Sequence, residues 1–158
     1  MLDEINDFRN AANVSSATLV STPEYQTYMD QRATEKAKQL ADTGTFNHSG
    51  QTLQDKFSNI HAGENIGAVD VNAGDSLDEQ VNQFIAYQKS ADQAEKDDYE
   101  AINIRHERTN ITNPSGTVGH YTNIIIPAAT KVVIGIGTYT KNGITYVAAV
   151  TSHITSMR

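Results

Sequence analysis

The sequence predicts an α+β fold in which helices pack on an antiparallel sheet. Apolar residues recur at helical spacing through the first half of the chain, whereas after Gly119 apolar and polar residues alternate as in strands. Helices followed by a meander of strands are typical of α+β proteins rather than of parallel α/β folds. The 158 residues suit one domain, and no linker or internal repeat divides them.

Spacing and end signals indicate the first two helices. Leu2, Ile5 and Phe8 lie three residues apart, which predicts a short amphipathic helix at the start of the chain. A longer helix is expected over residues 23–43, because a proline follows a hydroxyl residue at its start and Gly44 follows its last turn.

A capping box indicates where the third main helix begins. Ser76 lies three residues before Glu79, so a helix is expected over residues 76–90, or as far as Glu95. The following segment, residues 91–114, is strongly polar and has little periodicity. We therefore expect a long loop there.

Shorter elements are expected between the second and third helices. Apolar residues at helical spacing predict a short helix near residues 53–60. The segment 61–67 begins and ends near glycines and is expected to be a loop.

Three strands are predicted in the last third of the chain. Asn142 and Gly143 form an Asn-Gly turn signal, which predicts that the last two strands form a hairpin. Gly135 and Gly137 lie inside a predicted strand and indicate either a bulge or the close approach of a helix. The strands are expected at residues 121–126, 132–140 and 144–151.

Composition narrows the possible partners and chemistry. The net charge is −7 and no stretch gathers Lys and Arg, so nucleic acid and anionic membranes are not expected partners. No apolar run approaches the roughly 20 residues that a membrane-spanning helix needs, so no transmembrane segment is expected. The absence of cysteine excludes disulfides, thiol catalysis and thiolate metal sites.

Histidine and glutamate supply the candidate chemistry. His48 and His120 each lie close to a glycine in short segments of mixed polarity, and Glu64 lies between two glycines. These residues form no local metal motif, and no Gly-x-Ser-x-Gly nucleophile signature is present. From the residues alone, two interpretations remain open. The two histidines could have a structural role, or they could lie together in one site with one or two glutamates. The remaining histidines lie in polar contexts and are expected at the surface: His61, His106 and His153.

Several segments together resemble the CAP superfamily, the domain of cysteine-rich secretory proteins, antigen 5 and pathogenesis-related class 1 proteins. Residues 119–123, GHYTN, are similar to one family motif, and residues 63–66, GENI, to another. The resemblance covers nearly the whole chain, and the lack of cysteine resembles the bacterial, cysteine-free SCP-like branch. The other similar segments are residues 4–9, 47–50 and 132–137.

The resemblance implies an α-β-α sandwich, in which a three-stranded antiparallel sheet lies between helical layers. It also implies a cleft lined by two histidines and two glutamates. His48, Glu64 and His120 match three of these positions, and Glu95 is expected to be the fourth, with Glu100 as its competitor. Such a set suits Zn²⁺ or another divalent cation, and both Glu64 and Glu95 are candidate catalytic residues. The four side chains could instead stabilise one another and serve only the fold.

The resemblance further implies an extracellular or cell-surface bacterial protein, so residues 1–158 are expected to be a single CAP domain from a longer exported protein. The leading functional prediction is a binding module whose cleft could hold a divalent cation, with a host protein, wall polymer or lipid as its ligand. A metal-dependent hydrolase of proteins or wall polymers is the first alternative, and a lipid or sterol carrier is the second.

Overall fold

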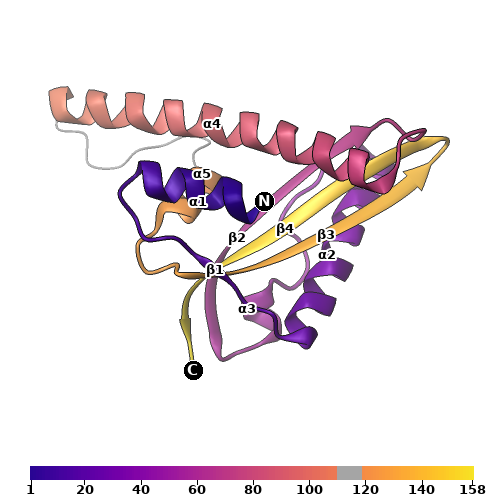
Figure 1. Cartoon of the computed structure of the whole chain (residues 1–158), viewed down its shortest axis with the longest axis horizontal. Helices are drawn as coiled ribbons and strands as arrows, with labels where there is room; N and C mark the ends of the chain where they lie inside the picture. The colour runs from indigo at the N-terminus through magenta and orange to yellow at the C-terminus, as the bar shows by residue number, and fades with distance from the viewer. Residues whose placement is uncertain (110–118) are drawn as a thin grey trace.

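The computed structural model describes the backbone of residues 1–109 and 119–158, and the side chains of residues 1–101 and 119–158. His106, which was expected at the surface, therefore has a side chain outside the described residues. The helices are α1 Leu2–Ala11, α2 Pro23–Thr43, α3 Leu53–Lys56, α4 Leu77–Thr109 and α5 Gly119–Ile125. A sheet lies among them, so the predicted α+β class is confirmed (Figure 1).

The described sheet has four strands rather than the three expected, and it is mixed rather than wholly antiparallel. The strands are β1 Thr18–Leu19, β2 Ile60–Val71, β3 Lys131–Lys141 and β4 Ile144–Met157. Their order across the sheet is β1-β3-β4-β2, with β1 parallel to β3 and the other neighbours antiparallel. A strand as short as β1 has too few residues to show the alternation that marks a strand in sequence.

β2 lies where the sequence predicted a loop at residues 61–67, and it pairs with β4 along its whole length. Its glycines permit close packing instead of forming turns. A Cβ atom at Gly63 would lie 2.6 Å from the side-chain oxygen of Asn123, and one at Gly67 would overlap the side chain of Gln88. The glycines of β2 therefore allow α5 and α4 to approach the strand.

The strand predicted at residues 121–126 is wrong, because this segment forms α5. Its tyrosine, threonine and isoleucines favour a strand locally, but Tyr121 and Ile124 lie three residues apart and enter one buried cluster with α1. The buried guanidinium of Arg9 donates to the carbonyls of Ile124 at 2.7 Å and Ile126 at 2.9 Å. These bonds satisfy carbonyls at the end of α5, so tertiary contacts outweigh the local preference.

α4 runs through most of segment 91–114, so the loop predicted there is wrong for the described residues. Its start is as predicted: the Glu79 backbone N–H donates to Ser76 Oγ at 3.3 Å, and the Ser76 N–H donates to Glu79 Oε2 at 2.9 Å. Only a narrow side of the helix meets the sheet, where Phe84 is buried. A mainly polar composition is therefore compatible with a helix. Residues 110–114 lie outside the described residues.

The hairpin between β3 and β4 is confirmed. Asn142 and Gly143 both have positive φ angles, as an Asn-Gly turn requires. A Cβ atom at Gly135 or Gly137 would overlap backbone atoms of α2, including those of Thr34. Of the two explanations for these glycines, the close approach of a helix is therefore the one observed.

Helices cover both faces of the sheet. Val132 packs in an apolar cluster with α1 and α5, whereas its neighbour Val133 packs with α2 and α3. Successive side chains of a strand point to opposite faces, so these clusters lie on opposite sides. Figure 1 shows the same layering, with the long α4 on the side of α1 and α5.

Candidate functional site

Two of the predicted cleft residues, Glu64 of β2 and His48 of the loop after α2, contact each other. The Glu64 side chain is 5 % exposed, and its carboxylate accepts hydrogen bonds from Nε and Nη2 of Arg32, both at 2.7 Å. Its Oε1 also lies 2.9 Å from Nδ1 of His48, whose side chain is 58 % exposed. Arg32 further donates to the carbonyls of His48 and Ser49. Both oxygens of Glu64 are thus already engaged.

The other two predicted residues also lie together. His120 is at the start of α5, and its Nδ1 lies 3.4 Å from Oε2 of Glu95 on α4. The His120 backbone N–H donates to the other oxygen of Glu95 at 3.1 Å. Glu100, the competitor for this position, is 56 % exposed and pairs with Lys96 at 3.7 Å. Glu95 is therefore the glutamate beside His120, and no described hydrogen bond or ion pair joins this pair to His48 or Glu64.

Two site residues were missed from the sequence, Asp92 and Gln88. The carboxylate of Asp92 is buried, and its Oδ1 lies 3.6 Å from Nδ1 of His120. Gln88 Nε2 donates to the same oxygen at 2.8 Å and lies 3.4 Å from His120 Nδ1. Gln88, Asp92 and Glu95 are spaced i, i+4 and i+7, so they share one side of a helix. This spacing is visible in the sequence, but it indicates a shared side only if the segment is a helix, and a loop was predicted over residues 91–114.

The environment of His120 favours its charged form. Burial alone lowers the pKa of this imidazole, but the neighbouring carboxyl groups of Asp92 and Glu95 outweigh that effect, so the pKa is raised. Burial raises the pKa of Glu95, and the charge of His120 acts against that shift. Without a cation, the cluster is thus an imidazole held between two carboxyl groups.

Asp92, Glu95 and His120 have a spacing that fits a metal ion. Each offers one ligand atom, and the three atoms lie within 4.8 Å of one another. Two ligands bound at 2.0–2.1 Å to a tetrahedral ion lie about 3.4 Å apart. His120 Nδ1 lies 3.4 and 3.6 Å from the two carboxylate oxygens. These separations match an ion's coordination better than they match charge-assisted hydrogen bonds, which are shorter.

Residues 2–151 match the cysteine-rich secretory protein family, CAP. The chain belongs to this family. The resemblance predicted from the motifs is confirmed, and the absence of cysteine is consistent with a cysteine-free branch. A search of curated proteins finds no match to the chain. No helix in the described part of this CAP domain is both long and apolar enough to cross a membrane.

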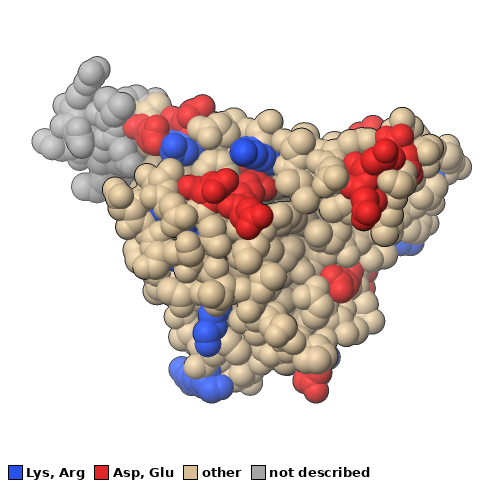
Figure 2. All heavy atoms as spheres, in the orientation of Figure 1, with Lys and Arg blue, Asp and Glu red and all other residues tan. Residues whose placement is uncertain are grey.

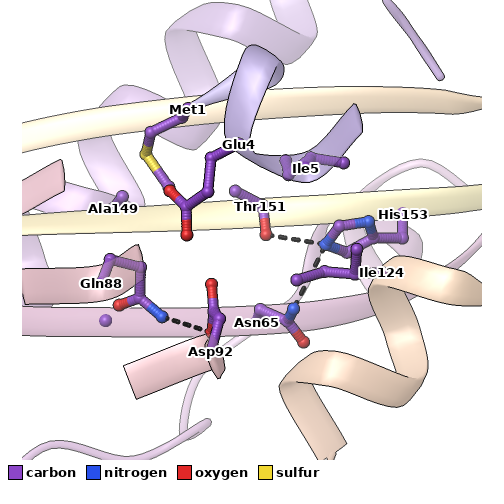
Figure 3. Close-up of a pocket in the computed structure, with 11 residues that line it drawn as sticks. Met1, Glu4, Ile5, Asn65, Gln88, Asp92, Ile124, Ala149, Thr151 and His153 are labelled. Atoms are coloured by element: carbon purple, nitrogen blue, oxygen red, sulfur yellow. Dashed lines mark hydrogen bonds between the residues drawn. The ribbon is translucent and has the colours of Figure 1, made fainter. Parts of the chain in front are cut away.

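A small cavity of about 20 Å³ lies behind Asp92 in the CAP domain. Figure 3 shows the carboxyl groups of Glu4 on α1 and Asp92 on α4 pointing toward each other across it. Both Glu4 oxygens are buried and have no hydrogen-bond partner among the described residues. Burial, together with the neighbouring Asp92, raises the pKa of Glu4 to about 8. Glu4 is therefore mainly a neutral acid at pH 7.

His153 lies on β4 beside this cavity, and its predicted surface position is wrong. Its side chain is buried, with Nε2 3.0 Å from Thr151 Oγ1 and 3.3 Å from Asn65 Nδ2. Burial lowers the pKa of His153 to about 4. Asn65 Nδ2 also donates to the carbonyl of His120 at 3.0 Å. Asn65 of the GENI segment thus contacts both His153 in the core and the backbone of His120.

His61 is exposed, as predicted.

A groove of about 540 Å³ opens beside the cluster, between β2 and α4. His120, Glu95 and Gln88 line one part of it, and the rest is mainly apolar. A volume of this size can accept a ligand of several residues or a small organic molecule. The cluster is thus connected to a space in which a ligand can bind.

Proposed function

We propose that this CAP domain is an extracellular or cell-surface binding module whose cleft holds a divalent cation at Asp92, Glu95 and His120. The observation that carries the proposal is the separation of His120 Nδ1 from the two carboxylate oxygens, 3.4 and 3.6 Å, which suits a tetrahedral ion. One imidazole nitrogen and two carboxylate oxygens form a donor set that Zn²⁺ accepts.

The proposed ligand set shares Glu95 and His120 with the predicted set of His48, Glu64, Glu95 and His120, but it includes Asp92 in place of His48 and Glu64. The bidentate ion pair with Arg32 satisfies both oxygens of Glu64 and brings a fixed positive charge, which disfavours a cation there. Neither His48 nor Glu64 is among the described residues that line the groove beside His120, so we leave both out of the proposed ligand set. Their role as metal ligands stays a prediction. Membership of a family described as secretory supports the extracellular setting.

A metal-dependent hydrolase is the second candidate. The observation that favours it is Glu95, whose carboxyl group lines the groove and has a pKa raised by burial. A raised pKa makes a carboxylate a better acceptor of a proton from water. Metal-dependent turnover of a peptide or wall polymer by the wild-type protein would favour this candidate over a pure binding module.

Calorimetric titration of Zn²⁺ into the metal-free protein at pH 7.5 tests the proposal. We expect binding in the micromolar range that weakens at least about tenfold in His120→Ala and in Asp92→Asn. His48→Ala is the matched control, because this histidine belongs to the other contact and should leave the affinity unchanged. Circular dichroism establishes that each variant is folded.

Two results would contradict the cation site. One is the absence of Zn²⁺ binding by the folded wild-type protein up to millimolar concentration. The other is a loss of affinity in His48→Ala that equals the loss in His120→Ala.

A further inference from the structure

The groove beside His120 has a stripe of α4 residues along one wall. Tyr87, Ala91, Ala94 and Asp98 follow one another at intervals of four, three and four residues, so they share one side of the helix. The two alanines form a shallow trough between a tyrosine and an aspartate. Along the helix axis the stripe covers about 16 Å, at about 1.5 Å per residue. The opposite wall is formed by Phe46, Ile66, Gly67 and Ala68.

The polarity of the groove changes from one end of the stripe to the other. Tyr87 supplies a large and partly exposed aromatic surface at one end. Asp98 and Glu95 supply two carboxyl groups at the other end, next to His120. No Lys or Arg is among the described residues that line the groove. A ligand that complements it therefore has an apolar part and a basic part.

The net charge of the whole chain also favours a basic ligand. The net charge is −7, and on the face seen in Figure 2 acidic side chains along the α4 side of the molecule outnumber the basic side chains, which form two patches there. Anionic lipid headgroups would be repelled by such a surface, whereas a basic ligand would be attracted to it. A divalent ion at the cluster would engage Glu95 but not Asp98, so an acidic group would remain for the ligand.

The position of β2 favours a peptide among basic ligands. β2 is an outer strand of the sheet, so on its groove side it has no neighbouring strand. An extended peptide can place its main chain beside an outer strand and present alternate side chains to the walls. At about 3.3 Å per residue, five extended residues match the length of the stripe.

We propose that the groove binds a short extended peptide segment that carries an apolar residue and, about four positions away, a Lys or Arg. The apolar side chain packs against Tyr87 and Phe46, and the basic side chain pairs with Asp98, while Glu95 stays with the cluster at His120. The inference rests on the proposed binding function and names the chemical class of its partner.

Fluorescence anisotropy with two labelled peptides tests the inference. The probes are Leu-Ala-Val-Ala-Arg and Leu-Ala-Val-Ala-Glu, both amidated, in buffer with EDTA so that the result does not depend on a bound cation. We expect the Arg peptide to bind at least about tenfold more tightly, and its affinity to fall as salt rises.

Variants on α4 locate the peptide. Asp98→Asn should weaken binding of the Arg peptide about fivefold, and Ala94→Phe, which fills the trough, should weaken both peptides. Asp97→Asn is the matched control: it makes the same change in charge one residue away, at a side chain that pairs with Gln93 and does not line the groove. It should leave the affinity unchanged.

Three results would overturn the inference. The first is equal affinity for the two peptides, and the second is equal effects of Asp97→Asn and Asp98→Asn on the binding of the Arg peptide. The third is displacement of the probe by phosphatidylcholine vesicles, which would assign the groove to lipid. Loss of peptide binding with intact Zn²⁺ binding overturns only this inference. Peptide binding without Zn²⁺ binding overturns only the cation site.

Discussion

Glu4 illustrates how a single buried residue makes the stability of the domain depend on pH. Its carboxyl group faces that of Asp92 across a small cavity, away from solvent. Burial and the neighbouring acid raise its pKa from 4.5 to about 8, so the folded state favours the neutral form. The contribution of Glu4 to stability is therefore complete below about pH 4.5 and is lost as the pH rises toward 8.

We predict that Glu4→Gln removes this pH dependence, because glutamine keeps the shape and stays neutral. Relative to the variant, the metal-free wild-type protein should lose roughly 3 kcal/mol of unfolding free energy between pH 5 and pH 8. Urea unfolding at both pH values measures the difference. Glu100→Gln, at an exposed position, is the control and should follow the wild type. Parallel pH curves for wild type and Glu4→Gln would show that Glu4 does not carry the effect.

Helix α5 illustrates how one element positions another. The segment that begins with His120 is a helix because its apolar residues pack on α1 and because Arg9 of α1 binds the carbonyls at its end. Local preference alone predicted a strand there. Arg9 and Ile124, which form the contact, are 115 residues apart in the chain. Sequence patterns report local preference. They could therefore identify His120 as a candidate site residue, but they could not predict that Arg9 would bind the end of the helix that carries it.

Arg9→Met should loosen the docking of α5. The variant keeps the apolar part of the side chain but removes the donor to four carbonyls, those of Ser15, Ile124, Ile126 and Pro127. We expect this loss to cost about 2–4 kcal/mol of unfolding free energy. Zn²⁺ affinity should also fall, because α5 holds His120. Urea unfolding and calorimetry measure the two effects. Lys38→Met, at an exposed cation, is the control and should change stability by less than about 0.5 kcal/mol. A variant with wild-type stability would contradict this role of Arg9.

At the scale of the whole molecule, the helical layers bring together residues from distant parts of the chain. Motifs in the sequence identified the family and four residues that form two separate contacts, His48 with Glu64 and His120 with Glu95. They did not identify Asp92, because a polar helix at the surface lacks the apolar stripe that predicts a helix. They also could not show that Arg32 neutralises Glu64, since the two residues come from different elements of the fold.

The proposed binding function depends on a cation at Asp92, Glu95 and His120. The most direct test is a crystal soaked in Zn²⁺ and measured with X-rays above and below the zinc absorption edge. We predict one strong anomalous peak within about 2.0–2.2 Å of His120 Nδ1 and of one oxygen from each carboxylate. A strong peak between His48 and Glu64, with none at His120, would contradict it.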